Sequence, residues 1–265
     1  MPVIVEFRLQ PSRPSGGLRA AFEPTTRQLH GLACALFETG RASDDAHVAP
    51  EKPFAVWPLR PAGDGWLLRG AWLPPGFPQS VLASAGEVRL GPVTCAVTDV
   101  ALHSATHEEL ADVPPVDGTR LTLLSPAYFA QSGAHIIDPD PRLIAGSWRR
   151  RWNASLRPDS GMHIDAALWR DIHLALHVTG SGLCTEHRDT GYRQQEGLTG
   201  TLTIRLESGA TPAVRQAFGA LSRFAEYCGT GAQVTHGFGA TKTTLLQTSW
   251  TAQEPSPPIS AKLME

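Results

Sequence analysis

Residues 224–242 read FAEYCGTGAQVTHGFGATK, with glycine at positions 229, 231, 237 and 239. A helix is predicted before this segment, because Thr211 is a suitable N-cap, Pro212 suits the first turn, and apolar residues then recur at helical spacing. A strand is predicted after it, from Thr241 to Leu246. Glycine accepts positive φ and lets another backbone come close. The sequence therefore predicts a helix, a tight glycine-rich loop and a closing strand, in that order.

Two interpretations of the glycine-rich loop stay open. Its main-chain N–H groups, with Thr230, Thr235, His236 and Lys242 nearby, can bind an anion such as a phosphate. The loop can equally be a structural turn between the helix and the strand. Known nucleotide motifs do not fit. In a dinucleotide-binding fingerprint the helix follows the glycines, and in a P-loop lysine precedes Ser or Thr, whereas here Thr241 precedes Lys242.

Composition limits the class of protein. The chain has 265 residues, of which 42% are hydrophobic, so it is long enough for two domains with ordinary cores. It contains no run of about 18 apolar residues, and its alternating, charged N-terminus suits a strand rather than a signal peptide. Its four cysteines form no Cys-x-x-Cys pair, so we expect no metal, no disulfide framework and no cofactor. A cytoplasmic protein without membrane contact is expected.

The basic residues are mostly arginine. Lysine and arginine together number 23, of which twenty are arginine, and the net charge is −2. Arginine binds phosphate through two parallel N–H groups and also stacks on bases. The net charge argues against a general nucleic-acid binder, so any RNA contact must come from a local patch. A high genomic GC content would produce the same bias without any function.

The element order predicts a ferredoxin-like fold in each half of the chain. In the first half, strand, helix, strand, strand, helix and strand are predicted at residues 3–9, 25–38, 54–59, 65–73, 78–85 and 93–102. Residues 111–119, with two prolines and a glycine, are the predicted linker. The order then recurs at residues 120–124, 142–153, 169–179, 198–206, from 211, and at 241–246.

We therefore predict an α+β protein with two tandem ferredoxin-like, RRM-like βαββαβ domains. The first domain spans residues 1–112 and carries the candidate catalytic helix and loop. The second spans residues 119–250 and carries the glycine-rich loop. Residues 251–265 have three prolines and mixed charge, so a disordered tail is expected there.

Residues 224–242 resemble the C-terminal glycine-rich signature of the CRISPR-associated repeat-RNA endoribonucleases, a family of the RAMP superfamily. Other landmarks of that family follow in the same order: LTLLSPAYF at residues 121–129, a helix at 142–152, and GLTGTLTIR at 197–205. The resemblance is strong from about Thr119 to Leu246 and weaker before that. It implies two ferredoxin-like domains side by side and cleavage of the repeats in precursor CRISPR RNA.

Cleavage of RNA without a metal requires three kinds of side chain. A base must take the proton of a ribose 2′-hydroxyl, an acid must protonate the departing 5′-oxygen, and cations must stabilise the phosphorane. Histidine suits the first two roles, because its pKa lies near neutrality.

The family resemblance indicates one catalytic pair. His47, a short spacer and Lys52-Pro-Phe resemble a family pattern in which the histidine and the lysine belong to the catalytic site. The resemblance thus implies that His47 is the general acid or base and that Lys52 stabilises charge. From the residues alone, a loop histidine beside Asp44 and Asp45 is more often a solvated surface residue.

His30, at the edge of the apolar stripe of the first helix, is the second catalytic candidate. The alternative is a boundary histidine that bonds a neighbouring backbone group. Some family members carry a catalytic tyrosine on this helix, where Cys34 stands here, and other relatives rely on arginines near it. Arg27 and Arg41 are therefore retained as candidate phosphate-binding residues.

Candidate RNA-binding residues fall into three groups. Arg149 and Arg150 lie in the densest basic cluster, between Trp148 and Trp152. Arg188 and Arg193 lie in a predicted hairpin loop, where Tyr192 can stack on a base. The glycine-rich loop contributes Gly229, Gly231, His236, Gly237 and Gly239, together with Lys242.

The sequence thus predicts a metal-independent endoribonuclease that cleaves a CRISPR repeat stem-loop to mature crRNA with 2′,3′-cyclic phosphate and 5′-hydroxyl ends. As in many relatives, the enzyme can remain on its product and join other subunits of an effector complex. The alternative is a non-catalytic RAMP subunit that holds guide RNA. A tandem RRM protein is a weaker alternative, because no strand carries the aromatic RNP motif.

Overall fold

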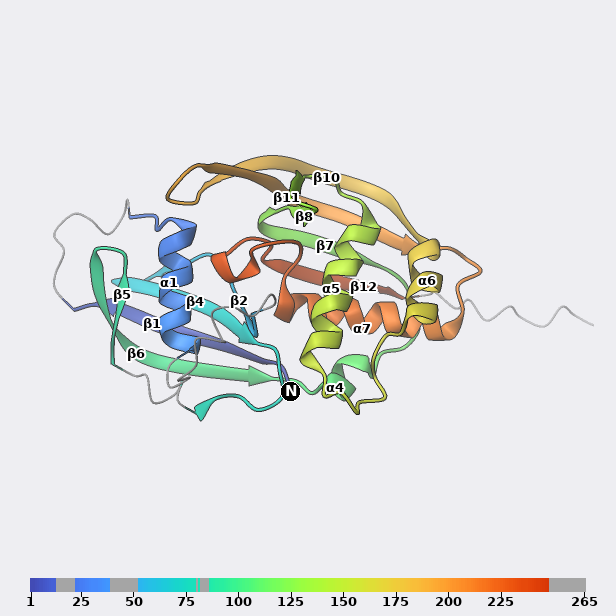
Figure 1. The fold of residues 1–265 in the computed structure, drawn as a ribbon, viewed down its shortest axis with the longest axis horizontal. Coiled ribbons are helices and arrows are strands. Elements are labelled where there is room, and N and C mark those ends of the chain that lie inside the picture. Colours follow the sequence, from blue (N-terminus) through green and yellow to red (C-terminus); the bar gives the residue numbers. More distant parts are fainter. Residues whose placement is uncertain (13–21, 39–51, 80, 82–85, 248–265) are drawn as a thin grey trace, which may run out of the picture.

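A computed structural model of the protein describes residues 1–12, 22–38, 52–79, 81 and 86–247. Two antiparallel sheets lie side by side along the long axis of the molecule (Figure 1). Helix α1 (Thr26–Phe37) covers the first sheet, and helices α5 (Pro141–Ser155) and α7 (Pro212–Cys228) cover the second (Figure 1). The two halves meet where the glycine-rich loop approaches helix α1.

The first sheet has the strand order β2-β4-β1-β6-β5, and β3 pairs with β4. Its elements are β1 (Val3–Pro11), α1 (Thr26–Phe37), β2 (Phe54–Val56), β3 (Arg60–Ala62), β4 (Gly65–Trp72), β5 (Glu87–Leu90) and β6 (Val93–Ser104). Helix α1 begins at a capping box, in which Thr25 and Gln28 bond each other's backbone. Leu29, Leu32 and Leu36 are fully buried in the core of this half.

The second sheet has the strand order β10-β11-β7-β12. The connecting helix α4 (His107–Ala111) precedes β7 (Val116–Ala127), β8 (Phe129–Gln131), β9 (Ala134–Ile136), α5 (Pro141–Ser155), α6 (Ala166–Ala175), β10 (Leu176–Asp189), β11 (Gln194–Leu206), α7 (Pro212–Cys228) and β12 (Thr241–Gln247). Trp148, Phe218 and Phe224 pack α5 and α7 into one core with this sheet.

The predicted fold class is confirmed, because each half has the strand order of a ferredoxin-like domain. Helix α7 begins at Thr211, whose side chain accepts from the N–H of Val214, and it ends at Gly229 with φ 68°. The glycine-rich loop therefore lies between a helix and a strand, as predicted. The predicted helix at 78–85 falls largely outside the described residues, as does the whole of the tail.

The structure differs from the prediction in several elements. Strands β3, β8 and β9 and helix α4 were not predicted, and β7 begins at Val116, within the predicted linker. Residues 169–175 form helix α6 instead of a strand, and the strand that follows starts only at Leu176. Strand β5 was not predicted. The first half of the predicted hairpin loop at 186–193 is strand, because β10 stays paired with β11 as far as Asp189, and residues 190–193 form the turn. No helix within the described ranges is long and apolar enough to cross a membrane.

Candidate functional site

The glycine-rich loop requires glycine for both its conformation and its packing. All four of its glycines have positive φ: 68° at Gly229, 83° at Gly231, 82° at Gly237 and 63° at Gly239. An added Cβ at Gly231 would collide with the carbonyl oxygen of Tyr128, and one at Gly239 with that of Thr230. The loop therefore lies tightly against its neighbours.

Several N–H groups of this loop already donate to protein acceptors. The bonds run from Thr230 N to Gly239 O at 2.8 Å, from Gly231 N to Ser147 Oγ at 3.2 Å, from Ala232 N to Tyr128 O at 2.7 Å and from Gly239 N to Pro126 O at 2.9 Å. The N–H of Gly229 caps helix α7 by donating to Ala225. These groups serve the fold.

Helix α5 holds the loop from one side. Trp148 Nε1 donates to Thr230 Oγ1 at 2.9 Å, and the buried Arg151 donates to the carbonyl of Gly231 at 2.6 Å. Thr230 Oγ1 also lies 2.8 Å from Thr241 Oγ1 at the start of β12. These bonds fix the loop between α5 and the sheet, and so fix the residues at its tip.

The tip of the loop, a 3-10 turn at Val234–His236, contacts helix α1 of the other half. The ring of His236 stacks on the ring of His30, with centroids 3.8 Å apart and an interplanar angle of 9°. Nδ1 of His30 lies 3.0 Å from the carbonyl oxygen of Thr235. Because a carbonyl only accepts, His30 carries a hydrogen on Nδ1. The structure thus brings two predicted site residues, His30 and His236, into direct contact.

The surroundings of the two rings favour neutral imidazole at His236. Burial and, to a smaller extent, the adjacent His30 together lower the pKa of His236 to about 4. On helix α1, Cys34 Sγ lies 3.5 Å from Nε2 of His30. Burial and, to a smaller extent, Glu38 together raise the pKa of the Cys34 thiol to about 12. The thiol is therefore protonated at neutral pH and can donate to His30.

Lys52 lies at the same junction. Its Nζ forms an ion pair with Glu38 at 3.0 Å, and both side chains are largely buried, with 15% and 9% of their surface exposed. Glu38 caps the end of α1, and Lys52 precedes β2, so the ion pair joins the two ends of segment 39–51. His47 and Arg41 belong to that segment and lie outside the described residues.

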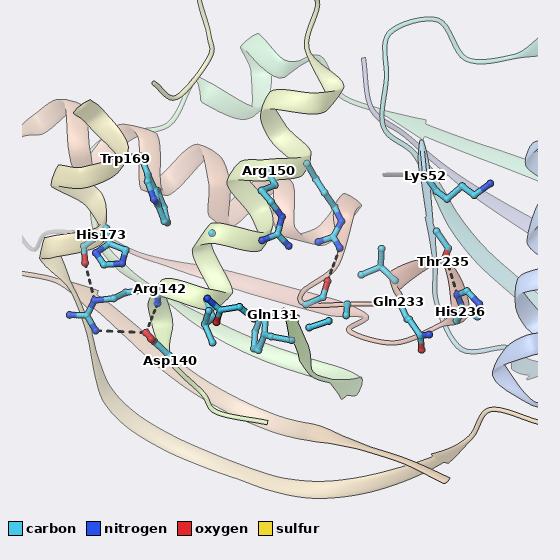
Figure 2. A pocket seen from close by; sticks show the side chains of 18 residues that line it. Lys52, Gln131, Asp140, Arg142, Arg150, Trp169, His173, Gln233, Thr235 and His236 are labelled. Atoms are coloured by element: carbon cyan, nitrogen blue, oxygen red, sulfur yellow. Dashed lines mark hydrogen bonds and ion pairs between the residues drawn. The ribbon is translucent and has the colours of Figure 1, made fainter. Parts of the chain in front are cut away.

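A cleft of about 650 Å³ opens between helix α5, helix α6 and the glycine-rich loop. Four of its lining side chains are lysine or arginine, and one is a carboxylate. Lys52, Thr235 and His236 lie at one end of the cleft, and Arg142, Trp169 and His173 at the other, with Arg150 between them (Figure 2). In a protein of net charge −2, this concentration of positive charge favours an anionic ligand.

A second cavity, of about 440 Å³, shares Gln233 and His236 with this cleft. It is lined by Thr26, Arg27, His30, Thr190, Tyr192, Arg193, Gln195, Gln233 and His236. The Arg27 guanidinium lies 4.8 Å from the centre of the Tyr192 ring. The turn between β10 and β11 therefore contacts the start of α1, and the predicted residues Arg27 and Arg193 share one cavity with His30 and His236.

Other predicted residues lie elsewhere. Arg149 donates to the carbonyl of Ile164 at 3.0 Å and lies over Trp169, whereas the exposed Arg150 lines the large cleft. Arg188 is partly buried, and this burial lowers its pKa against the opposing effects of Glu23 and Glu186. Lys242 is exposed on strand β12 and lines neither cavity.

Sequence reasoning missed the far end of the large cleft. Arg142, Trp169 and His173 were not predicted as site residues, and Gln233 was not predicted at the tip of the loop. Trp169 and His173 are four residues apart, which places them on one face of a helix. That signal was lost because residues 169–179 were predicted to form a strand.

The chain is similar to known proteins at the level of sequence. The family model described as CRISPR-associated endoribonuclease Cas6 matches residues 121–241. CRISPR-associated endoribonuclease Cas6 from Mycobacterium tuberculosis, in two strains, is 25% identical over 158 residues, which cover 58% of this chain and 49% of the relative. The chain thus spans about half the length of the curated relatives it matches.

Solved structures show the same similarity. A product complex of Cas6 (TTHB231) is 28% identical with a TM-score of 0.77, and covers 92% of this chain and 99% of its own. Thermus thermophilus Cas6 (TTHB231) is 26% identical with a TM-score of 0.70, covering 92% and 98%. A product complex of Cas6 (TTHA0078), 23% identical with a TM-score of 0.74 and coverage of 92% and 100%, shares the fold. These matches confirm the resemblance to the CRISPR-associated endoribonucleases.

Proposed function

We propose that this protein is a metal-independent endoribonuclease that binds CRISPR repeat RNA and cleaves it to mature crRNA. The observation that carries the proposal is the junction of the two halves, where His236 stacks on His30 and lines two cavities that also contain basic residues. The similarity to Cas6 proteins, one of them a product complex, supports the same activity.

The proposed reaction uses the ribose 2′-hydroxyl beside the scissile phosphate as the nucleophile. Its oxygen attacks phosphorus, its proton passes to a base, and the 5′-oxygen of the next nucleotide leaves with a proton from an acid. The products are a 2′,3′-cyclic phosphate and a 5′-hydroxyl. Acid–base assistance of this kind contributes about 10²–10⁴ in rate, and a cation beside the phosphorane adds further stabilisation.

His47 and Lys52 are the proposed catalytic pair. Lys52 lines the large cleft at the end where Thr235 and His236 lie (Figure 2). His47 precedes Lys52 by five residues, and an extended chain of that length spans at most about 18 Å. His47 is therefore tethered within reach of the junction, where it can act as general acid or base while Lys52 stabilises the phosphorane.

His30 was predicted as a catalytic residue, and the geometry suggests a positioning role for it. Its Nδ1–H donates to Thr235, and its Nε2 faces the thiol of Cys34, so both nitrogens have protein partners. The stacked pair of His30 and His236 then holds helix α1 against the glycine-rich loop. In this proposal the buried glycines shape the loop, and phosphate binding falls to arginine side chains.

The proposed RNA-binding residues are those that line the two cavities. Arg27 and Arg193 in the smaller cavity and Arg150 in the larger one would contact the phosphates, and Tyr192 would stack on a base. The proposed partner is the stem-loop of a CRISPR repeat. The cleaved RNA can stay bound and carry the protein into an effector complex.

The second candidate function is a non-catalytic RAMP subunit that binds guide RNA. The buried ion pair between Lys52 and Glu38 favours the enzyme, because it holds a lysine at the cleft, where a binding subunit needs no such group. Cleavage of a synthetic repeat RNA in EDTA decides between the two.

The experiment begins by mapping the cut on a denaturing gel. A second RNA carries a 2′-deoxyribose at the nucleotide that precedes the cut. We expect the unmodified RNA to be cut at one position in EDTA with a cyclic phosphate at the new end, and the modified RNA to bind equally and remain intact. Cleavage of the deoxy RNA, or a strict requirement for added Mg²⁺, would contradict the mechanism. Tight binding with no cleavage would identify the binding subunit.

A further inference from the structure

The end of the large cleft away from Lys52 has features of a separate binding site. It lies between helices α5 and α6 and is formed by Arg142, Trp169 and His173 (Figure 2). The whole cleft measures about 650 Å³, within the range of about 300–1,000 Å³ that is typical of small-ligand sites. It therefore has room for more than the reacting phosphate.

Helix α6 places an aromatic side chain in this cleft. The helix begins at Asp165, whose side chain accepts from the N–H of Leu168 at 2.8 Å. One turn later Trp169 and His173 lie on the same face, with ring centroids 5.8 Å apart and an interplanar angle of 71°. The indole is partly exposed and lines the cleft, so a flat ligand can contact it.

At one point beside this indole, helix α5 has no projecting side chain, because the residue there is Gly146. Gly146 lies in the middle of α5, where glycine costs about 0.5–1 kcal/mol relative to alanine. A Cβ at that position would lie 3.5 Å from the indole of Trp169. Any longer side chain at residue 146 would project into the cleft, so glycine keeps the space beside Trp169 open.

Positive charge surrounds the aromatic ring. Arg142 is held by an Nε bond of 3.2 Å to the carbonyl of His173 and by Asp140 Oδ1 at 3.7 Å, yet its side chain remains 42% exposed. The Arg149 guanidinium lies 5.4 Å from the indole centroid. An oriented arginine beside a tryptophan matches a ligand with a flat ring and a phosphate, which is the chemistry of a nucleotide.

We propose that Trp169 and Arg142 form a subsite for one unpaired nucleotide of the bound RNA, with its base on the indole and its phosphate on the guanidinium. This inference rests on the proposed function, because the cleft is continuous with the end that holds Lys52 and His236. The nucleotide must be unpaired, because a base within a duplex is already stacked and cannot present a face to a side chain in a cleft.

The test combines variants of the protein with abasic positions in the RNA. Repeat RNAs carry one abasic nucleotide at each unpaired position in turn, and their affinity is measured by fluorescence anisotropy for wild type, Trp169→Ala, Trp169→Phe, Trp169→Leu and Arg142→Ala. Arg170→Ala is the matched control, because Arg170 is exposed on the same helix and does not line the cleft. A mononucleotide in large excess is added as a competitor in a separate series.

We expect wild type to lose about tenfold in affinity at one abasic position, as is typical for the loss of one stacked base. Trp169→Ala and Trp169→Leu should bind intact RNA about tenfold more weakly than wild type does. An abasic nucleotide at that same position should not weaken their binding further. Trp169→Phe should behave like wild type. Arg142→Ala should weaken binding with a smaller salt dependence, and Arg170→Ala should change nothing. Phe and Leu both retain apolar volume, so their comparison stands if the alanine variant folds poorly.

Four results would overturn the inference. The first result is that the loss of RNA affinity caused by Trp169→Ala is the same with intact RNA and with every abasic RNA. The indole would then stack on no base. If wild type cleaves the repeat and all Trp169 variants bind it equally, the subsite is wrong and the proposed function stands. If the mononucleotide binds through Trp169 while RNA affinity is unaffected, the cleft serves a free nucleotide. A wild type that binds no repeat RNA would overturn both proposals.

Discussion

Two glycine-containing loops meet at the junction of the halves, and they differ in how their polar groups are used. The glycine-rich loop after α7 is buried, and the N–H groups of Thr230, Gly231 and Gly239 donate to protein acceptors. The turn between β10 and β11 is exposed and carries Tyr192, with 77% of its surface accessible, and Arg193. The first loop supports the site, and the second is free to contact a ligand. Composition alone does not separate these two roles.

This comparison predicts that alanine in the glycine-rich loop has the largest effect on stability. Gly239→Ala adds a Cβ against the carbonyl of Thr230 and also forces alanine into positive φ. Left-handed backbone costs about 1–2 kcal/mol and overpacking about 1–3 kcal/mol. We therefore expect Gly239→Ala to lower the free energy of unfolding, measured in urea, by about 3 kcal/mol or more. Gly133→Ala is the control, because φ is 79° there with no atom within 4 Å of the added Cβ. Equal losses for the two variants would contradict the packing argument.

A neighbouring pair of arginines on α5 gives the next largest effect. Arg151 is buried and donates to the carbonyl of Gly231, whereas Arg150 is exposed. Removal of a charged buried donor leaves its acceptor unsatisfied, so Arg151→Met should cost about 1.5–3 kcal/mol. Arg150→Met should change stability by less than about 0.5 kcal/mol. The difference should be visible in thermal unfolding, and an equally large loss for Arg150→Met would show that the loop is not held as described.

The free energy of unfolding should depend on pH because of His236, one member of the stacked histidine pair. The pKa of His236 is lowered from 6.5 to about 4 by burial, so the unfolded chain binds a proton between these values that the folded protein does not. The contribution of His236 to the free energy of unfolding is therefore fully present above about pH 6.5 and is lost as the pH falls toward 4. His107, whose pKa burial also lowers to about 4, acts in the same direction. His236→Gln should reduce the slope of stability against pH in this window, and an unchanged slope would contradict the assignment.

The exposed turn should show the smallest effect on stability and a clear effect on RNA. Tyr192→Ala and Arg193→Ala should each change the free energy of unfolding by less than about 0.5 kcal/mol, because both side chains are exposed. Arg193→Ala should lower the salt dependence of repeat binding by about one phosphate contact. Tyr192→Ala should weaken binding at all salt concentrations. A loss of stability without any change in binding would place the turn in the fold instead of the interface.

Much of the fold could be predicted from local patterns. The helix after Thr211 and the strand after Gly239 follow from capping, periodicity and glycine, which are properties of adjacent residues. Helix α6 was missed because residues 169–179 were interpreted as an alternating strand and the N-cap at Asp165 was not recognised. The error hid the shared face of Trp169 and His173.

The candidate site could be predicted only in part, because its geometry depends on long-range contacts. Nothing near His30 indicates that it will bond Thr235, which is 205 residues away in the chain. The sequence also does not show which N–H groups of the glycine-rich loop the fold will use. Lys52 and His236 were predicted separately, and only the structure places them at the same end of one cleft.

Whether the junction is a catalytic site for RNA cleavage can be decided by measuring single-turnover cleavage by His47→Ala. The variant is compared with wild type on the same repeat RNA in EDTA, with binding measured in parallel and Lys52→Ala as a second variant. We expect His47→Ala to bind the RNA as wild type does and to cut it at least about a hundredfold more slowly, because a general acid or base is lost. Cleavage at the wild-type rate by His47→Ala would contradict this expectation.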